Sequence, residues 1–378
     1  DFGGFGGDCD INAFKRFLTG VKKTRFEIRK RGKVMKKILA LAVAIMLTAA
    51  IFSGCKKTVS ESSEASRITE NSVKTGLAVI SSIAKSKDVA DGTGLAEVDS
   101  TIVAVTVDKT GKIVKCVIDA VQTKVDFSDK GTITTPLNTK FKTKNELGTE
   151  YGMKGASKIG REWNEQAAAF AKYAEGKTAG EVAGIAVDES KHPTGSDLKS
   201  SVTISVGDFI AGVQKAVANA KDSGAKAADK LGLGVVTSIA KSKDASDTEA
   251  GLAQAYSTYA VTTTDAQGKI TSCVIDASQT DVNFNKAGKI TSDLTAEQKT
   301  KDELGLAYGM KSASKIGKEW NEQAAAFAQY VKGKTVSEVN SIAVDQSGKP
   351  AGTDITASVT VSVGDFKGTI EKAVAGAK

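Results

Sequence analysis

An internal repeat constrains the fold of this 378-residue chain more than any other feature. Residues 151–209 align with residues 308–366 at a constant offset of 157, and 41 of the 59 aligned positions are identical. Cys116 and Cys273 share this offset. A repeating unit of roughly 150 residues has the size of a domain, whereas solenoid repeats are about 20–45 residues long. The chain is therefore expected to contain two copies of one domain.

The similarity also sets the expected boundaries. Residues 71–220 form the first copy, residues 232–378 form the second, and the Ala- and Lys-rich residues 221–231 link them. Because the copies are so similar and the linker is polar, each copy is expected to bury a core of its own.

Each copy has the pattern of an α+β domain. β-Branched residues on both sides of a Gly-containing turn at residues 108–112 predict a β-hairpin, and the second copy repeats this pattern around Gly268. A strong amphipathic helix is predicted further on, because apolar residues recur at spacings of four and three: Ile159, Trp163, Ala167, Phe170 and Ala174.

The later part of each copy predicts two more helices and a strand. A Thr three residues before a Glu, at residues 178–181 and 335–338, is a capping box that opens a short helix. In residues 200–206 apolar side chains alternate with hydroxyls, which predicts a half-buried strand before a final helix over residues 208–217. Residues 122–150 carry no readable pattern. The expected fold class is α+β, as two tandem copies of a small sheet-plus-helices domain.

The net charge of +8 lies almost entirely outside the repeats. Residues 1–54 carry 11 Lys and Arg against 4 Asp and Glu, so the remainder of the chain carries 41 against 40. A nearly neutral folded part offers no basic surface, and nucleic-acid binding is not expected. One His and four Cys also leave too few ligands for a multi-histidine metal site or a disulfide scaffold.

Residues 35–54 have the parts of an export signal in their usual order. Two lysines after Met35 precede an apolar run over residues 38–52, and two small residues then precede Cys55. This segment resembles a bacterial lipoprotein signal peptide with a lipobox, in which Phe52 departs from the usual aliphatic residue. The resemblance implies cleavage before Cys55, acylation of that cysteine, and an extracytoplasmic protein anchored to the bacterial membrane by its lipid.

The segments on either side of the signal are not expected to fold. Residues 1–34 have no recognisable pattern, and we interpret them as a non-native segment upstream of the signal peptide. Residues 55–70 are polar and Ser-rich, which is typical of a flexible tether.

Few side chains in the repeats indicate catalysis. His192 is the only histidine and the second copy has Lys349 at that position, so it is expected to be a loop residue. Cys116 and Cys273 have no partner within their own copies and are expected to be buried and inert. The two Trp residues of the chain lie on the apolar helix stripes, where core packing is expected instead of ligand stacking.

One short motif near the end of each copy indicates a specific chemistry. Residues 197–203 read Asp-Leu-Lys-Ser-Ser-Val-Thr, residues 354–360 read Asp-Ile-Thr-Ala-Ser-Val-Thr, and a predicted helix follows each. This resembles the flavinylation motif of FMN-binding domains, Asp-x-x-Ser/Thr-Gly-Ala-Thr. The order of hairpin, helices, motif and final helix is similar to that family as well.

The resemblance implies roles for four residues. Thr203 and Thr360 are the expected attachment sites, to whose hydroxyls a flavin transferase esterifies the FMN phosphate outside the cytoplasm. Asp197 and Asp354 are the expected motif acids.

The motif departs from the family at its Gly-Ala pair. Both copies have Ser-Val there, at residues 201–202 and 358–359, and residue 357 is Ala where the family has Ser or Thr. The added Cβ and Cγ atoms are expected to crowd the approach of the backbone to a flavin. Thr203 also fits an outward-facing residue of an ordinary amphipathic strand. Noncovalent binding of a flavin or another small ligand, and a domain without a cofactor, therefore stay open beside a covalent flavin.

Two functions therefore remain open. The first is an envelope-anchored lipoprotein with two FMN-binding-like domains that carries electrons outside the cytoplasm. Its expected partners are the membrane, a flavin transferase and redox proteins. The alternative is a cofactor-free surface lipoprotein with a binding or structural role. An electron carrier or a binding protein is favoured over a turnover enzyme.

Overall fold

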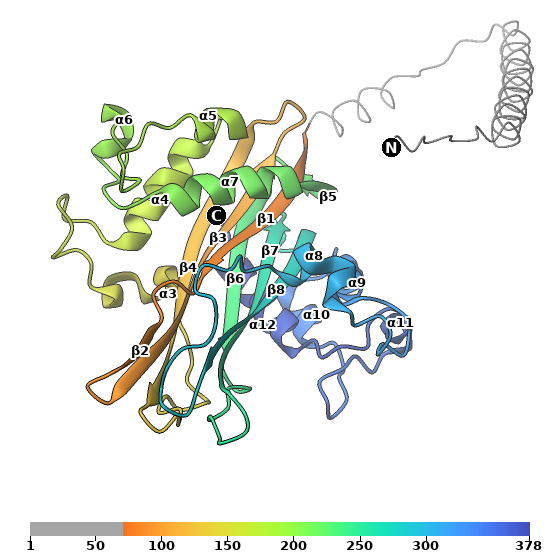
Figure 1. Cartoon of the computed structure of the whole chain (residues 1–378). Coiled ribbons are helices and arrows are strands. Elements are labelled where there is room, and N and C mark those ends of the chain that lie inside the picture. Colours follow the sequence, from red (N-terminus) through yellow and green to blue (C-terminus); the bar gives the residue numbers. More distant parts are fainter. Residues whose placement is uncertain (1–70) are drawn as a thin grey trace, which may run out of the picture. The chain divides into compact units, whose positions relative to one another are not determined.

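The first repeat builds an antiparallel sheet around one long hairpin (Figure 1). In the computed structural model, which describes residues 71–378, β3 (Thr93–Val107) pairs with β4 (Ile113–Ser128) along almost its whole length. Three further strands complete the sheet: β1 (Ser72–Ser82), β2 (Lys87–Ala90) and β5 (Lys221–Lys226). Gly111 closes the hairpin turn with a φ of 84°, which Gly adopts without strain. The predicted hairpin is confirmed, and β4 continues to Ser128, into the segment without a readable pattern.

Strand β5 lies within the segment expected to be a linker. It pairs antiparallel with β1, where Thr75 is opposite Lys221. Its backbone groups thereby gain partners that a free linker lacks. The polar composition of residues 221–226 reflects their place at the edge of the sheet, where their side chains are mostly exposed.

The helices of the first repeat cover one face of this sheet. In chain order they are α3 (Lys144–Leu147), the 3₁₀ turn η1 (Gly148–Tyr151), α4 (Trp163–Ala174), α5 (Ala179–Ala183), α6 (Ser196–Lys199) and α7 (Gly207–Asn219). The amphipathic helix and the final helix are confirmed as α4 and α7. Helix α4 begins at Trp163, so Ile159 precedes it. The capping box at the start of α5 is confirmed, because Thr178 and Glu181 each accept a hydrogen bond from the backbone of the other.

The strand predicted over residues 200–206 is wrong. Its backbone amides bond to turn carbonyls and to a side chain instead of to a neighbouring strand: Val202 N donates to Leu198 O at 2.9 Å and Val206 N to Lys191 O at 2.9 Å. Val202 and Val206 are fully buried, which produces the period of two. The alternation therefore comes from a compact turn between α6 and α7.

The second repeat has counterparts of the helices and of the three long strands β1, β3 and β4 in the same register, and its sheet has three strands where the first has five. These counterparts are β6 (Lys230–Ser238), β7 (Gly251–Thr264), β8 (Ile270–Phe284), α8 (Lys301–Leu304), the 3₁₀ turn η2 (Gly305–Tyr308), α9 (Trp320–Tyr330), α10 (Val336–Asn340), α11 (Thr353–Thr356) and α12 (Gly364–Ala375). Val103 is opposite Ile118 in the first hairpin, and the equivalent Ala260 is opposite Ile275 in the second. The chain is an α+β protein made of two tandem copies of one sheet-plus-helices domain.

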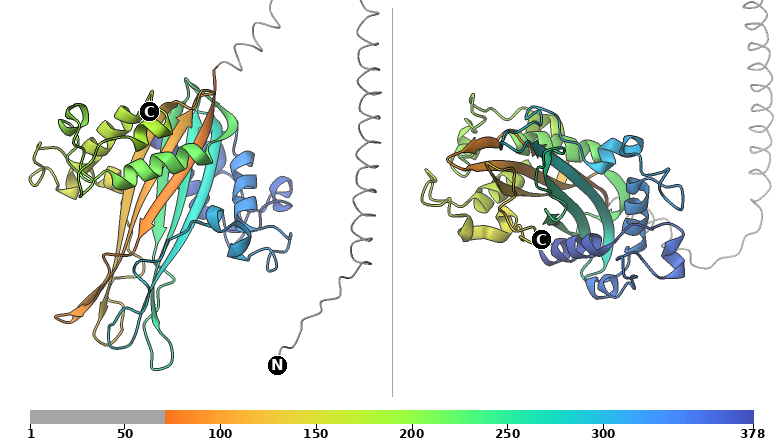
Figure 2. Two further views of the ribbon diagram at one scale, coloured as in Figure 1. Left: turned by 45° about the horizontal axis from the view of Figure 1, so that its top comes forward. Right: turned by 60° about the horizontal axis from the view of Figure 1, so that its bottom comes forward.

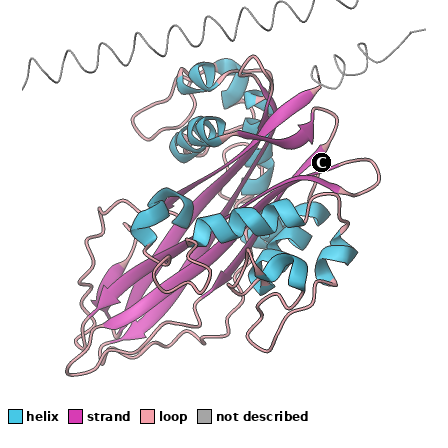
Figure 3. Cartoon of the chain, turned by 90° about the vertical axis from the view of Figure 1, so that its right-hand side faces the viewer, coloured by secondary structure: helices cyan, strands magenta, loops and turns pink. Residues whose placement is uncertain are grey.

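The two sheets pack face to face, and the helices lie on their outer faces (Figures 2 and 3). Alternate residues of each strand point to opposite sides of its sheet. Val103 and Val105 face the helices of the first repeat, whereas Ile102 and Ala104 face the other sheet and pack with Tyr259. The molecule therefore has a core under each set of helices and a shared core between the sheets.

Contacts between the repeats are reciprocal. Phe127 stacks on its own counterpart Phe284, with ring centroids 4.2 Å apart. Ile133 N donates to Asp244 Oδ1 at 2.8 Å, and Ile290 N donates to Asp88 Oδ1 at 2.7 Å. Such pairs of equivalent contacts are the signature of an isologous, two-fold interface. The tandem repeat thus forms an internal pseudo-dimer.

Candidate functional site

The two threonines of the motif have the same setting in both repeats. Each follows the short helix α6 or α11 and precedes the last helix of its repeat. Thr360 N donates to Gln323 Oε1 at 2.8 Å, and the Thr360 hydroxyl lies 3.2 Å from the same oxygen. Thr203 makes the same contacts with Gln166, at 2.8 and 3.3 Å. A buried glutamine therefore fixes the position of each threonine.

These glutamines are functional candidates that the sequence reading missed. Gln323 is fully buried on α9, and its amide nitrogen also donates to Ser314 Oγ at 3.1 Å and to Lys318 O at 3.2 Å. A signal was present in the sequence, because Gln323 stands on the apolar stripe between Trp320 and Phe327. A polar residue on such a stripe requires buried partners.

The motif acids do not meet the threonines. Asp354 Oδ2 accepts a hydrogen bond from Tyr330 OH at 2.7 Å, and Asp197 Oδ2 accepts one from Tyr173 OH at 2.6 Å. Tyr330 lies seven residues after Gln323 on α9, roughly 10 Å along the helix axis. The hydrogen bond from Tyr173 holds the pKa of Asp197 below its usual value. Each acid ties the short helix before the threonine to the long helix of its repeat.

The valines that replace the motif Ala are core residues. Val359 and Val202 are buried in the helix–sheet cores of their repeats. The residues of this segment that line the neighbouring cavity are Thr360, Val361 and Ser362. The expected crowding at the Ala position is therefore absorbed by the core.

A cavity of about 580 Å³ lies beside Thr360. Small-molecule sites have volumes of roughly 300–1,000 Å³. The rings of Tyr256, Tyr308 and Trp320 contribute to its wall. Four lysines and one carboxylate line it as well: Lys241, Lys301, Lys315, Lys349 and Asp365. The cavity thus combines aromatic surface with an excess of positive charge.

Lys301 occupies an aromatic cage in this wall. Its side chain is buried, with Nζ 4.5 Å from the ring centres of Tyr256 and Tyr308 and 4.8 Å from that of Trp320. Nζ also donates to Tyr256 OH at 2.9 Å. Burial lowers the pKa of Lys301 to about 8. The ring faces stabilise the ammonium group through cation–π contacts.

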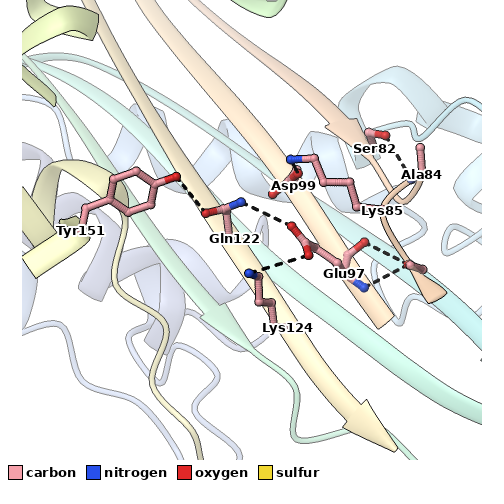
Figure 4. Close-up of polar contacts among 9 residues, drawn as sticks. Ser82, Ala84, Lys85, Glu97, Asp99, Gln122, Lys124 and Tyr151 are labelled. Carbon is pink, nitrogen blue, oxygen red and sulfur yellow. Dashed lines mark hydrogen bonds and ion pairs between the residues drawn. The ribbon is translucent and has the colours of Figure 1, made fainter. Parts of the chain in front are cut away.

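The first repeat keeps the caged lysine as Lys144, whose Nζ lies 4.7 Å from the ring centre of Tyr151 and 5.0 Å from that of Trp163. Its strand β3, however, has carboxylates where the second repeat has neutral side chains (Figure 4). Asp99 takes the position of Tyr256, and its Oδ2 lies 2.5 Å from Lys85 Nζ. Glu97, two residues earlier on β3, is buried and accepts from Gln122 Nε2 at 3.3 Å. Gln122 in turn accepts from Tyr151 OH at 3.2 Å. The two repeats therefore share a framework but differ in charge.

The remaining candidates behave largely as expected. Cys116 and Cys273 are free and buried, and burial raises the pKa of both thiols, that of Cys273 to about 12. His192 lies in an exposed loop with Nδ1 3.2 Å from Asp188 Oδ2. Its counterpart Lys349 nevertheless lines the cavity, which the sequence did not indicate.

The tryptophans combine a core role with a place in the cavity wall. Trp320 is buried and packs edge-on against Phe366, with ring centroids 5.6 Å apart. Trp163 does the same with Phe209 at 5.7 Å. The expected core packing is confirmed, and Trp320 also lines the cavity.

Within residues 71–378, no cluster of three or more His, Cys, Asp or Glu side chains could hold a metal ion. No helix in the same range is long and apolar enough to cross a bilayer.

A short stretch of the chain is similar to a known protein. Forty residues, 11% of this chain, are 58% identical to a segment of a chlorophenol reductase from Desulfitobacterium hafniense. The match spans 12% of that protein. No family model matches the chain, and no solved structure matches it.

Proposed function

We propose that this chain is an envelope-anchored lipoprotein that carries electrons outside the cytoplasm through FMN esterified to Thr360 and Thr203. The observation that carries the proposal is the placement of Thr360 at a cavity with aromatic walls and an excess of lysine. Aromatic rings pack against a flat ring system, and cations favour a phosphate group. FMN supplies one- and two-electron transfer when bound.

The residues around Thr360 would hold and orient the group. Lys241, Lys315 and Lys349 are exposed cations at the cavity and would neutralise the phosphate. An ester at Thr360 removes the hydroxyl hydrogen that points to Gln323, but the backbone N–H of Thr360 remains bonded to that glutamine at 2.8 Å. Gln323 would therefore keep the modified threonine in place.

The short match to a chlorophenol reductase adds modest support. The matched protein is named as a reductase, which is a redox enzyme. Because the match spans 12% of that protein, its substrate is not carried over to this chain.

The test is covalent fluorescence. The mature chain is expressed with a flavin transferase in an exporting host and run on a denaturing gel under ultraviolet light. A phosphoester-linked flavin survives denaturation, so the band should fluoresce. Fluorescence should fall in Thr360→Val and in Thr203→Val and vanish in the double variant. Thr335→Val, at a threonine that caps α10 and does not line the cavity, is the matched control and should leave the fluorescence unchanged.

A cofactor-free surface lipoprotein remains the second candidate. It is favoured by the hydrogen bonds of Thr203 and Thr360 to buried glutamines, which give both threonines a structural role without a ligand. A dark gel beside an efficiently flavinylated control protein would support this candidate, as would the absence of yellow colour in the native chain.

Anchoring has a separate test, because Cys55 lies outside the described residues. Acylation of Cys55 holds the protein in the membrane fraction of a bacterial host. Cys55→Ser should release it after export, whereas Cys116→Ser should leave the fractionation unchanged. Retention of Cys55→Ser in the membrane fraction, with normal export, would contradict acylation.

A further inference from the structure

The two candidate flavin sites differ in charge at two nearby positions of the same strand. In the first repeat, β3 places Glu97 and Asp99 beside Gln122 of β4, and Asp99 is directly opposite Gln122. In the second repeat the same places on β7 hold Gln254 and Tyr256, and Tyr256 is directly opposite Gln279. The backbone framework is thus the same, while two carboxylates are replaced by neutral side chains.

The carboxylates of the first repeat are only partly compensated. Asp99 Oδ2 pairs with Lys85, but its Oδ1 is buried and has no hydrogen-bond partner among the described residues. Glu97 lies 3.8 Å from Lys124 Nζ, whose side chain is 54% exposed to water. Water screens such an exposed cation and weakens its effect on the buried carboxylate.

Both repeats have a lysine caged by aromatic rings at the equivalent place, and in the first repeat this is Lys144, whose Nζ lies 4.7 Å from the ring centre of Tyr151 and 5.0 Å from that of Trp163. The second repeat differs in having no carboxylate at the position of Asp99. Lys301 Nζ is held by the hydroxyl of Tyr256 and by three aromatic rings, and the carboxylate that lines its cavity, Asp365, is exposed. Lys349, one of the four lysines that line the cavity, adds a cation where the first repeat has His192. Asp281, which replaces Lys124, is bonded to Gln254 at 3.0 Å, and the cavity wall does not include it.

We propose that the two repeats are unequal redox sites, with the flavin at Thr360 at a higher midpoint potential than the flavin at Thr203. This inference rests on the proposed flavinylation of both threonines. Two electrons from an external reductant increase the negative charge on a bound flavin. A nearby ammonium stabilises that charge and a nearby carboxylate destabilises it. Because both repeats keep the caged lysine, the replacement of Asp99 by Tyr256 and of His192 by Lys349 orders the two sites.

The experiment compares flavins one at a time in the full mature chain. Thr203→Val leaves the flavin at Thr360, and Thr360→Val leaves the flavin at Thr203. Each protein is titrated with dithionite and mediators while the flavin absorbance is recorded. The flavin at Thr360 should be favoured for reduction at least tenfold, which is about 30 mV for a two-electron couple.

Residue exchanges then test the cause. With the flavin at Thr360, Tyr256→Asp should lower the potential, whereas Tyr256→Phe should leave most of it unchanged because no charge is added. With the flavin at Thr203, Asp99→Tyr should raise the potential. Asp99→Asn, a smaller change that also removes the charge, should raise it as well and serves if the tyrosine does not fit. Equal potentials in the two single-site proteins, or exchanges without effect, would overturn the inference while the covalent fluorescence upholds the proposed function. Absence of fluorescence from both sites would reject both.

Discussion

Gln323 controls the geometry of the candidate site at the level of a single residue. Its side chain satisfies Thr360 N, Ser314 Oγ and Lys318 O inside the protein. Gln323→Ala should therefore cost about 2–3 kcal/mol of the free energy of unfolding, because buried partners lose their hydrogen bonds. Urea titration of the full chain measures this loss. Thr360→Val removes a single hydroxyl contact and should cost about 1 kcal/mol or less. Equal losses in the two variants would contradict the role assigned to Gln323.

Lys301 gives the stability a dependence on pH. Its folded pKa of about 8 lies below the usual value near 10.4 in an unfolded chain. Between these values the unfolded chain binds more protons, so stability rises with pH through that window, by up to about 3 kcal/mol. Below pH 8 the penalty for the buried ammonium is present in full. Lys301→Met should abolish the rise, since Met packs well against aromatic rings.

Urea titrations at pH 7 and pH 10 measure this effect. The matched control is Lys315→Met, which removes an exposed lysine from the same cavity and should keep the rise. A rise of the same size in Lys301→Met would show that other groups cause it.

The sequence predicted the burial of individual residues better than it predicted which residues they contact. The burial of Cys116, Cys273 and the tryptophans followed from strand and helix patterns that lie close together in the chain. The cage around Lys301 could not be predicted, because Tyr256, Tyr308 and Trp320 come from three separate elements. Only the folded chain brings them together.

At the scale of elements, the capping boxes offer a matched pair of tests. Thr178 begins α5 and Thr335 begins α10, and each accepts a hydrogen bond from the backbone of a Glu three residues later. Thr178→Ala and Thr335→Ala should each lower the free energy of unfolding by about 1 kcal/mol. Thr→Ser at the same positions should restore most of it. Different losses in the two repeats, measured by chemical denaturation, would show that tertiary contacts dominate over the cap.

The elements also show where sequence patterns mislead. The helices and the hairpin were predictable because their apolar periods extend over many residues. Residues 201–206 have the period of a strand, but Thr203 N is bonded to the side chain of Gln166 and not to a strand. A period of two over six residues fits a turn with two buried valines as well as it fits a strand.

At the scale of the whole molecule, the sequence indicated two domains but not their shared core. Ile102, Ala104 and Phe127 face the other repeat, whereas their strand neighbours face the helices. Strands covered on both faces read as continuous apolar runs, and such a run does not say what covers each face. The pairing of equivalent surfaces follows from the pseudo-two-fold arrangement, which no local pattern encodes.

This shared core predicts that the repeats unfold together. Phe127 stacks on Phe284 between the sheets, so Phe127→Ala removes packing from both repeats and should cost about 3–5 kcal/mol. The two tryptophans of the chain allow each repeat to be followed separately, since Trp163→Phe leaves only Trp320 in the second repeat, and Trp320→Phe leaves only Trp163 in the first. In either background, Phe127→Ala should shift the urea midpoint recorded by the remaining tryptophan by the same amount. A shift recorded by Trp163 alone would mean that each repeat is stabilised by its own helix–sheet core and that the contact between the sheets contributes little.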